Sequence, residues 1–311
     1  RPGGVLRGEV NLPPEETSRY FGDGDQLGLL FNFMTPCYIF AALAAEKAKL
    51  IDEALTLLAE PPTDCGWANF LRNLDELDYS QVHPDIKKVA FDAFASDPAV
   101  IVHDRGIRRR LAPMLDGDHD RIAMALSLLL SLPGAPVLVY GDEIGMGDDL
   151  SQPDRVSVRI PMQWSGKRQG GFSSAPAANL IQPVVADGPF SYKSINVEAQ
   201  EGDETSLLSR VKRLIFMRRE IALLLRGRPV PVRSGVESVF ARASGNGVDT
   251  ILTLHNLSSR QQEVELTFDL GQDTEFTNLL TGEKTTAREG MKLTLPGHGY
   301  AWLRGRAAKP V

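Results

Sequence analysis

Residues 67–77 read Trp67-Ala68-Asn69-Phe70-Leu71-Arg72-Asn73-Leu74-Asp75-Glu76-Leu77, and the rest of the chain is organised around this stretch. It begins as an apolar run, which is typical of a strand that is covered on both faces and therefore lacks polar alternation. It ends in polar and charged side chains, which are costly at the end of a buried strand unless they face a solvated pocket. In a parallel α/β barrel the carboxyl ends of the strands form the catalytic face. Taken alone, the stretch fits equally well a strand that runs into an ordinary charged surface turn.

The segments around this stretch alternate between short apolar strands and helices. Strands are predicted over 5–10, 27–33, 67–71 and 136–140, and helices over 11–17, 39–58 and 116–132. This alternation predicts a parallel sheet in an α/β fold. The connection 76–113 is too long for a simple loop inside a compact domain, so it is predicted to form a lid or a small subdomain.

The character of the chain changes near residue 226. A long loop rich in Gly, Pro and Ser, 145–198, leads to an amphipathic helix over 204–225. Beyond it, short strands at 238–242, 250–254, 263–268 and 292–295 are separated by turn residues, which is typical of a small antiparallel β-sandwich. We therefore expect an α/β domain over 1–226, a β-sandwich over 227–306 and a tail over 307–311.

Composition excludes several classes of protein. The 311 residues are 42% hydrophobic and 24% charged, as in a soluble globular protein, and the net charge of −6 argues against a nucleic-acid or anionic-membrane surface. The longest apolar run, 122–132, is too short to cross a bilayer. The basic run Arg108-Arg109-Arg110 precedes Leu111 and is predicted to be one turn of a helix. Cys37 and Cys65 lie far apart and predict reduced core thiols in a cytoplasmic protein.

Two carboxylates stand at predicted strand ends, Glu9 and Asp75. In a barrel both would point into the same bowl, and a pair of carboxylates flanking a bond is what glycoside hydrolysis requires. Arg72 and Asn73 could hydrogen-bond a sugar beside them. The alternative is that both acids are surface residues. Asp142 and Glu143 end the fourth predicted strand and are similar candidates, with helix capping as their alternative role.

Other motifs are less specific. Trp164 in the loop segment 159–164 indicates either a platform for a sugar ring or ordinary loop packing. The acidic run 116–120 resembles a calcium loop but lacks its downstream bidentate Glu, so it is better explained as a helix cap. The five histidines have no metal-ligand spacing, and no serine-nucleophile, P-loop or dinucleotide motif is present.

Several motifs in order resemble the α-amylase superfamily, glycoside hydrolase family 13, and within it the trehalose synthase (maltose α-D-glucosyltransferase) group. They include Asn73-Leu74-Asp75-Glu76-Leu77 and Arg159-Ile160-Pro161-Met162-Gln163-Trp164, together with the segments 106–113, 132–137, 140–148 and 195–200. The resemblance runs over nearly the whole chain.

The resemblance implies a fold and a site. The fold is a (β/α)8 barrel, of which this chain holds the C-terminal half, strands five to eight, followed by a β-sandwich. Glu9 matches the general acid/base on the fifth strand, and Asp75 matches the transition-state-stabilising Asp after the seventh. The insertion 76–113 would close the pocket. The substrate-binding residues would be Arg72, Asn73, Glu76, Arg159 and Trp164.

The implied activity is retaining chemistry on α-glucosides such as maltose and trehalose, by transfer through a glucosyl-enzyme intermediate or, alternatively, by α-glucosidase-type hydrolysis. No cofactor is expected in this segment, and any calcium would bind in the N-terminal half of the barrel. A different alternative is a non-catalytic barrel kept as a binding or assembly module.

Two departures from the family pattern qualify this expectation. The family's nucleophilic Asp lies on the fourth strand, which precedes Arg1, so the expected partner of this chain is its own N-terminal half, with homo-oligomerisation as a further option. The family also has His between the residues equivalent to Asn73 and Asp75, where this chain has Leu74. Leucine cannot donate the hydrogen bond that this His makes to the sugar.

Overall fold

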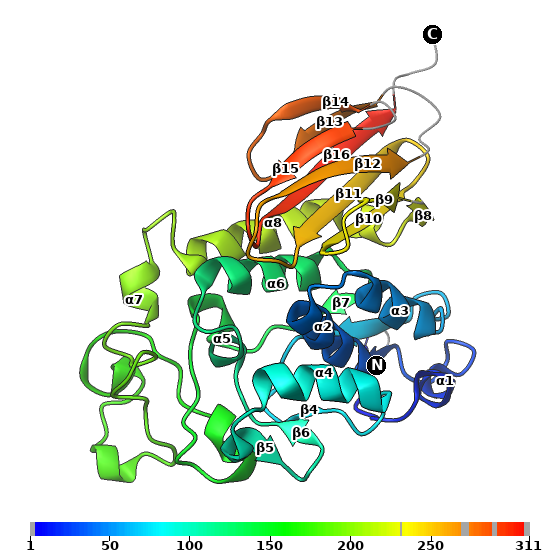
Figure 1. Cartoon of the computed structure of the whole chain (residues 1–311). Coiled ribbons are helices and arrows are strands. Elements are labelled where there is room, and N and C mark those ends of the chain that lie inside the picture. Colours follow the sequence, from blue (N-terminus) through cyan, green and yellow to red (C-terminus); the bar gives the residue numbers. More distant parts are fainter. Residues whose placement is uncertain (1–3, 231, 269–273, 288–290, 308–311) are drawn as a thin grey trace.

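The computed structural model describes residues 4–230, 232–268, 274–287 and 291–307 (Figure 1). A parallel sheet of four short strands lies at the centre of the first part of the chain, in the order β1-β2-β3-β7. The strands are β1 (Arg7–Gly8), β2 (Leu29–Phe31), β3 (Gly66–Asn69) and β7 (Ala135–Pro136). Leu30 faces Trp67 in the register of β2 with β3, and Ala68 faces Ala135 in that of β3 with β7. The predicted α/β alternation is therefore confirmed, with shorter strands than expected.

The helices between and after these strands differ from the prediction most clearly at residue 46. They are α1 (Pro14–Thr17), α2 (Met34–Ala45), α3 (Lys49–Leu57), α5 (Leu111–Met114), α6 (His119–Ser131) and α8 (Leu207–Leu225), with the short α7 (Val197–Gln200) before α8. The single helix predicted over 39–58 is two helices, because Glu46 takes a left-handed conformation (φ 53°) and turns the chain. Pro36 lies in the first turn of α2, where backbone N–H groups have no intrahelical acceptor and proline is tolerated.

Asp118 caps the amino end of α6. Its Oδ1 accepts hydrogen bonds from the backbone N–H groups of Asp120 (2.8 Å) and Arg121 (3.1 Å). The acidic run 116–120 thus stabilises a helix start. Within the described residues, no group of three or more His, Cys, Asp or Glu side chains is arranged to hold a metal ion.

Replacing Asp118 by Ala is expected to destabilise the fold by about 1 kcal/mol, because two N–H groups of the first turn lose their acceptor. Urea unfolding measures the change. The matched control is Asp92→Ala, which removes only an exposed ion pair with Lys88. Equal unfolding midpoints for the two variants would contradict the capping role.

The insertion 76–113 carries its own secondary structure. Strands β4 (Leu77–Asp78), β5 (Ile101–Val102) and β6 (Gly106–Ile107) form a small antiparallel sheet in the order β4-β6-β5, and α4 (Pro84–Phe94) packs beside α2. The predicted helical turn over 108–110 is wrong, since these residues lie before α5 and Arg110 is extended. Their guanidinium groups bind three separate acceptors in the loop 142–152, which a helical turn would not allow: the Gln152 carbonyl, Asp148 and Asp142.

The C-terminal part is a pair of antiparallel sheets, as the sequence predicts. One has the order β14-β13-β16-β11-β10-β8 and the other β15-β12-β9. The strands are β8 (Arg228–Val230), β9 (Val232–Arg233), β10 (Val239–Gly245), β11 (Asp249–Asn256), β12 (Gln262–Phe268), β13 (Thr274–Asn278), β14 (Lys284–Ala287), β15 (Met291–Leu295) and β16 (Tyr300–Ala307). Leu254, Val264 and Phe276 share the apolar core of this part. The rest of the predicted tail, 308–311, lies outside the described residues.

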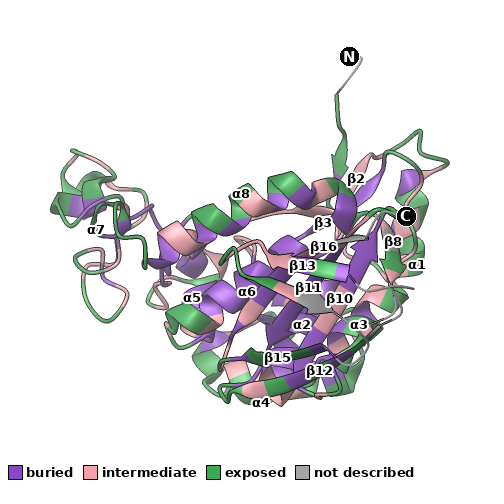
Figure 2. Ribbon diagram, turned by 90° about the horizontal axis from the view of Figure 1, so that it is seen from above, coloured by how far each residue is buried: buried purple, intermediate pink, exposed green. Residues whose placement is uncertain are grey.

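Helices α6 and α8 lie against the six-stranded sheet, and Figure 2 shows α6 largely buried while α8 exposes one side. A buried polar cluster joins α6 to this sheet. The Trp302 indole N–H donates to Ser127 Oγ (3.0 Å), and Ser127 Oγ lies 3.0 Å from His255 Nε2. Because the indole can only donate, the Ser127 hydrogen is available for His255 Nε2. Burial lowers the pKa of His255 to about 3, so the imidazole is neutral in this core.

Both cysteines are unpaired and buried, as predicted. Among the helices of the described part of the chain, none combines the length and the apolar character that a membrane crossing requires.

Candidate active site

A cavity of about 480 Å³ opens at the carboxyl ends of the parallel strands. Each strand contributes residues that lie a few positions beyond its end: Glu9 after β1, Phe33 after β2, the segment 72–75 after β3 and the segment 137–140 after β7. Parallel strands end at the same edge of their sheet, so side chains far apart in sequence meet there. The structure thus places Glu9 and Asp75 on one cavity, together with Arg72, Asn73 and Arg159.

Glu9 is exposed on the cavity wall. Within the described part of the chain no hydrogen bond or ion pair holds its carboxylate, which leaves both oxygens available to a bound molecule. Arg7, two residues before Glu9, makes a cation–π contact instead: its guanidinium lies over the Phe31 ring, 4.8 Å from the ring centre.

Asp75 is the more firmly held of the two carboxylates. Its backbone N–H donates to Asn73 Oδ1 (3.1 Å), and its side chain pairs with Arg159. Arg159 is oriented in turn by a hydrogen bond from its Nε to the Leu74 carbonyl (2.8 Å). Asp75 is 30% exposed, so its carboxylate lies beside Arg159 and Arg155 and is still open to the cavity. Leu74 lines the same cavity with an apolar side chain.

Arg72 lines the cavity but turns most of its donors inward. Its Nε donates to the Arg109 carbonyl (2.6 Å), and its Nη2 donates to the carbonyls of Asp75 (2.9 Å) and Ile107 (3.1 Å). Burial lowers its pKa to about 10, with Asp142 nearby opposing that shift. Arg72 therefore ties the insertion to the end of β3, and only Nη1 has no hydrogen-bond partner among the described residues.

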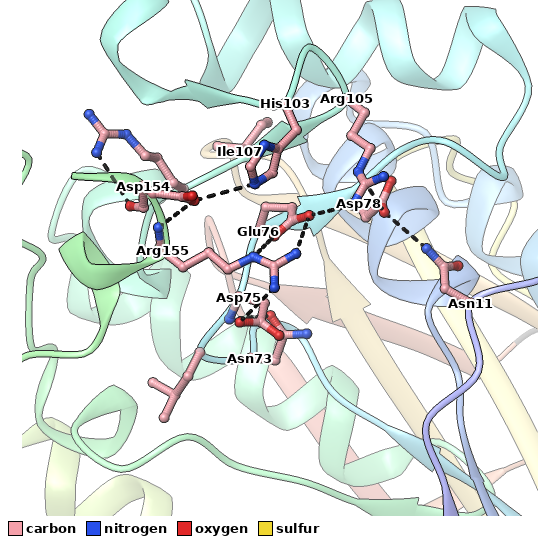
Figure 3. A network of polar contacts seen from close by, with 12 residues as sticks. Asn11, Asn73, Asp75, Glu76, Asp78, His103, Arg105, Ile107, Asp154 and Arg155 are labelled. Atoms are coloured by element: carbon pink, nitrogen blue, oxygen red, sulfur yellow. Dashed lines mark hydrogen bonds and ion pairs between the residues drawn. The ribbon is translucent and has the colours of Figure 1, made fainter.

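Glu76 lies on the other side of the chain from the cavity. Its buried carboxylate accepts from Arg155 Nε (2.6 Å), Arg155 Nη2 (2.9 Å) and Arg105 Nη2 (3.1 Å), as Figure 3 shows. Burial opposes its ionisation, but the hydrogen bonds from Arg155 and Arg105 outweigh burial and lower its pKa to about 2. The sugar contact expected for Glu76 from its place in the motif does not follow from this geometry, because the carboxylate is buried, binds two arginines and does not line the cavity.

A second cavity, of about 570 Å³, adjoins the first and shares Tyr140 and Arg159 with it. Trp164 lines it with about half of its surface exposed, beside the similarly exposed Phe172. Glu143 also faces this cavity. Asp142 instead is buried against Arg110, and burial raises its pKa to about 6 while Arg110 opposes that change.

The sequence analysis did not identify two residues of the site as functional candidates. Tyr140 separates the two cavities, with its hydroxyl donating to the Ile160 carbonyl (2.6 Å). Arg155 approaches Asp75 and binds Glu76, 79 positions away. Tyr140 ends a predicted strand and could have been found from that position, but Arg155 lies in an ordinary polar loop and carries no sequence signal.

Comparison with known proteins gives two family matches. The model described as "Alpha amylase, catalytic domain" matches residues 8–227, and the one described as "Sucrose hydrolase-like, C-terminal domain" matches residues 249–304.

The most similar relatives include two bacterial proteins. The chain is 40% identical to the trehalose synthase/amylase of Mycobacterium tuberculosis, over 97% of this chain and 52% of that protein. It is also 40% identical to the trehalose synthase of Thermus thermophilus, over 100% of this chain and 32% of that protein. The chain thus spans about half or less of the length of these relatives.

Solved structures resemble the fold at lower identity. An α-amylase from H. orenii superposes with a TM-score of 0.69 at 22% identity, covering 97% of this chain and 53% of that one. The trehalose-6-phosphate hydrolase of Bacillus licheniformis gives 0.62 at 15% identity, covering 98% and 56%.

Proposed function

Because this chain belongs to the α-amylase family, glycoside hydrolase family 13, we propose that it forms part of a retaining enzyme acting on α-glucosides such as maltose and trehalose. The observation that carries the proposal is the common cavity of Glu9 and Asp75, which follow different strands and face one space of about 480 Å³. That space suits one sugar ring with its hydroxyls near two carboxylates and an arginine. The 40% identity to trehalose synthases supports the choice of substrate.

In this proposal Glu9 is the general acid and base. It protonates the oxygen of the departing sugar and later takes the proton from the acceptor hydroxyl, which forms the new bond to the anomeric carbon. Its exposed carboxylate, held by no partner in the described chain, is free to exchange a proton twice in each cycle. Asp75 binds sugar hydroxyls with bonds that strengthen as the ring flattens, while its ion pair with Arg159 orients the carboxylate.

The nucleophile in this scheme is a carboxylate that the proposed N-terminal half of the barrel supplies to the same cavity. We further propose that the chain divides into barrel residues 1–226, with the insertion 76–113 closing the site, and a β-sandwich over 227–306.

A cytoplasmic location is proposed on the strength of the two buried unpaired thiols, Cys37 and Cys65. Trp164 and Asn73 are proposed to contact the substrate.

The test is to incubate the protein that contains this chain with maltose and to separate the products by chromatography. Trehalose identifies isomerisation by return of the glucosyl group to the released glucose, and glucose alone identifies hydrolysis. A protein that converts no α-glucoside would refute the enzyme. Exclusion of water decides between transfer and hydrolysis, and the insertion 76–113 is the element proposed to provide it.

Leu74 supports a second candidate, a barrel that binds sugars without converting them. Its side chain lines the cavity between Asn73 and Asp75 and offers no hydrogen bond. Such a module would bind maltose with unchanged affinity whether or not Glu9 keeps its charge.

The variant Leu74→His is expected to raise kcat/KM for maltose about tenfold, because one added hydrogen bond to the sugar is worth about 1.4 kcal/mol. Steady-state kinetics measures the change, and Leu74→Phe is the control for ring size without the donor. If the His and Phe variants behave alike, Leu74 has no bearing on sugar recognition.

A further inference from the structure

A continuous chain of polar contacts links the segment after β1 to the segment after β3 (Figure 3). It starts at Asn11, two residues after Glu9, whose Nδ2 donates to Asp78 Oδ2 (3.1 Å). Asp78 Oδ2 pairs with Arg105 Nε (3.2 Å), and Arg105 Nη2 pairs with Glu76 Oε1 (3.1 Å). The insertion therefore bridges the two strand ends that carry the proposed catalytic acids.

The chain continues from Glu76 to Asp75 through Arg155. Both oxygens of Glu76 accept from Arg155, at 2.6 Å and 2.9 Å, which fixes the plane of the guanidinium. The third nitrogen, Nη1, then lies 3.7 Å from Asp75 Oδ1. Figure 3 shows the Arg155 guanidinium between the two carboxylates. Glu76 is almost fully buried, whereas the Arg155 side chain is 35% exposed, so the buried carboxylate is the fixed partner in this pair.

The adjacent acids Asp75 and Glu76 thus have different roles. Glu76 points away from the cavity and orients Arg155, and Asp75 points toward the cavity and is approached by the oriented arginine. This chain of contacts begins at Asn11, in the segment of Glu9, and ends at Asp75. It therefore connects the two segments whose spacing sets the distance between the Glu9 and Asp75 carboxylates. Displacements of about 1 Å at such a pair cost about a hundredfold in rate.

We infer that Glu76 and Arg155 are positioning residues, which fix the Asp75 carboxylate relative to Glu9 across the cavity. The inference rests on the proposed function, in which Asp75 acts mainly in the transition state. The alternative is that the same contacts only fasten the insertion to the sheet. The two roles differ in what happens to kcat when the fold is retained.

The test uses Arg155→Gln, Arg155→Lys and Glu76→Gln in the protein that contains this chain, with kinetics on the α-glucoside that the wild type converts best. Arg155→Gln is expected to lower kcat about 10- to 100-fold and to change KM less than about threefold, because the lost interaction orients a group that acts in the transition state. Arg155→Lys is expected to be nearly as slow, since an ammonium keeps the charge but cannot bind both Glu76 oxygens. Glu76→Gln is expected to lower kcat about tenfold, because the amide weakens the two hydrogen bonds that orient the Arg155 guanidinium.

Lys88→Gln is the matched control, since Lys88 pairs with Asp92 at 2.5 Å on the exposed face of α4 in the same insertion. Its kcat is expected to stay within about 1.5-fold of the wild type. Variants of Arg155 and Glu76 that melt at lower temperature but keep kcat within twofold would overturn the inference and leave a purely fastening role.

A crystal structure of Arg155→Gln separates this inference from the proposed function. If the wild type converts no α-glucoside, the proposed function fails, and the position of Asp75 in the variant still decides the positioning role. A displacement of the Asp75 carboxylate by about 1 Å or more supports it. An Asp75 that stays in place with Arg159 overturns it.

Discussion

Glu9→Gln is expected to lower the turnover of maltose by about 10²- to 10⁴-fold, because the amide cannot protonate the departing oxygen or accept a proton from the acceptor. Since Glu9 is exposed and the described chain makes no hydrogen bond to its carboxylate, the substitution removes no internal contact. The thermal midpoint is therefore expected to be unchanged. Steady-state kinetics and a melting curve measure the two quantities together.

A substrate with a better leaving group sharpens this experiment. Fluoride needs little protonation to depart, so α-glucosyl fluoride should form the glucosyl-enzyme intermediate in the Glu9→Gln variant far faster than maltose does. The matched control is Glu16→Gln, an exposed acid on α1 away from the cavity. Equal turnover by Glu9→Gln and the wild type would refute the role of Glu9. Equal maltose binding with no turnover in either protein would favour the non-catalytic module.

Stability is expected to fall as pH decreases from about 6.5 toward 3, because His255 must stay neutral in the folded core. Its folded pKa is about 3 against 6.5 in the unfolded chain, so the unfolded state binds a proton that the native state does not. The contribution of His255 is complete above pH 6.5 and is lost at about 1.4 kcal/mol per pH unit below it. Between pH 7 and pH 4 the loss amounts to about 3 kcal/mol.

Urea unfolding at pH 7, 5 and 4 measures this dependence, and His255→Gln isolates it. The glutamine can still accept from Ser127 but does not titrate, so its stability should fall less steeply with acid by about 3 kcal/mol over the same range. The comparison also cancels the contributions of two other groups, which both proteins share. Glu76, with a pKa of about 2, stabilises the fold less as the pH falls below 4.5, and Asp142, with its raised pKa, has the opposite effect on the free energy of unfolding. Identical slopes for the two proteins would show that His255 does not titrate on unfolding.

Local patterns in the sequence were sufficient for much of the fold. The apolar run before Arg72 predicts a buried strand, and the parallel order β1-β2-β3-β7 confirms the alternation around it. Asp118 predicts a helix start by its own side chain, and it caps α6. The failures are local as well. Glu46 turns left-handed and divides a helix that its composition predicts to be continuous, and Arg110 is extended because its partner lies in a distant loop.

The site likewise has features that the sequence predicts and features that it does not. The position of Glu9 and Asp75 at strand ends depends only on where apolar runs stop, and this can be read from the chain. The motif around Asp75 also predicted a sugar contact for its neighbour Glu76. The structure turns the Glu76 side chain away from the cavity, toward Arg155 and Arg105, which bind its carboxylate.

The α/β and β-sandwich architecture, the family and the two acids beyond the strand ends are therefore predictable from the sequence, since they depend on residues close together along the chain. The long-range contacts of buried polar groups are visible only in the folded chain. Glu76 meets Arg155 across 79 positions, and Ser127 meets His255 and Trp302 across 128 and 175. Such pairs are specific because burial removes the competing water, and burial is a property of the folded chain that no single segment carries.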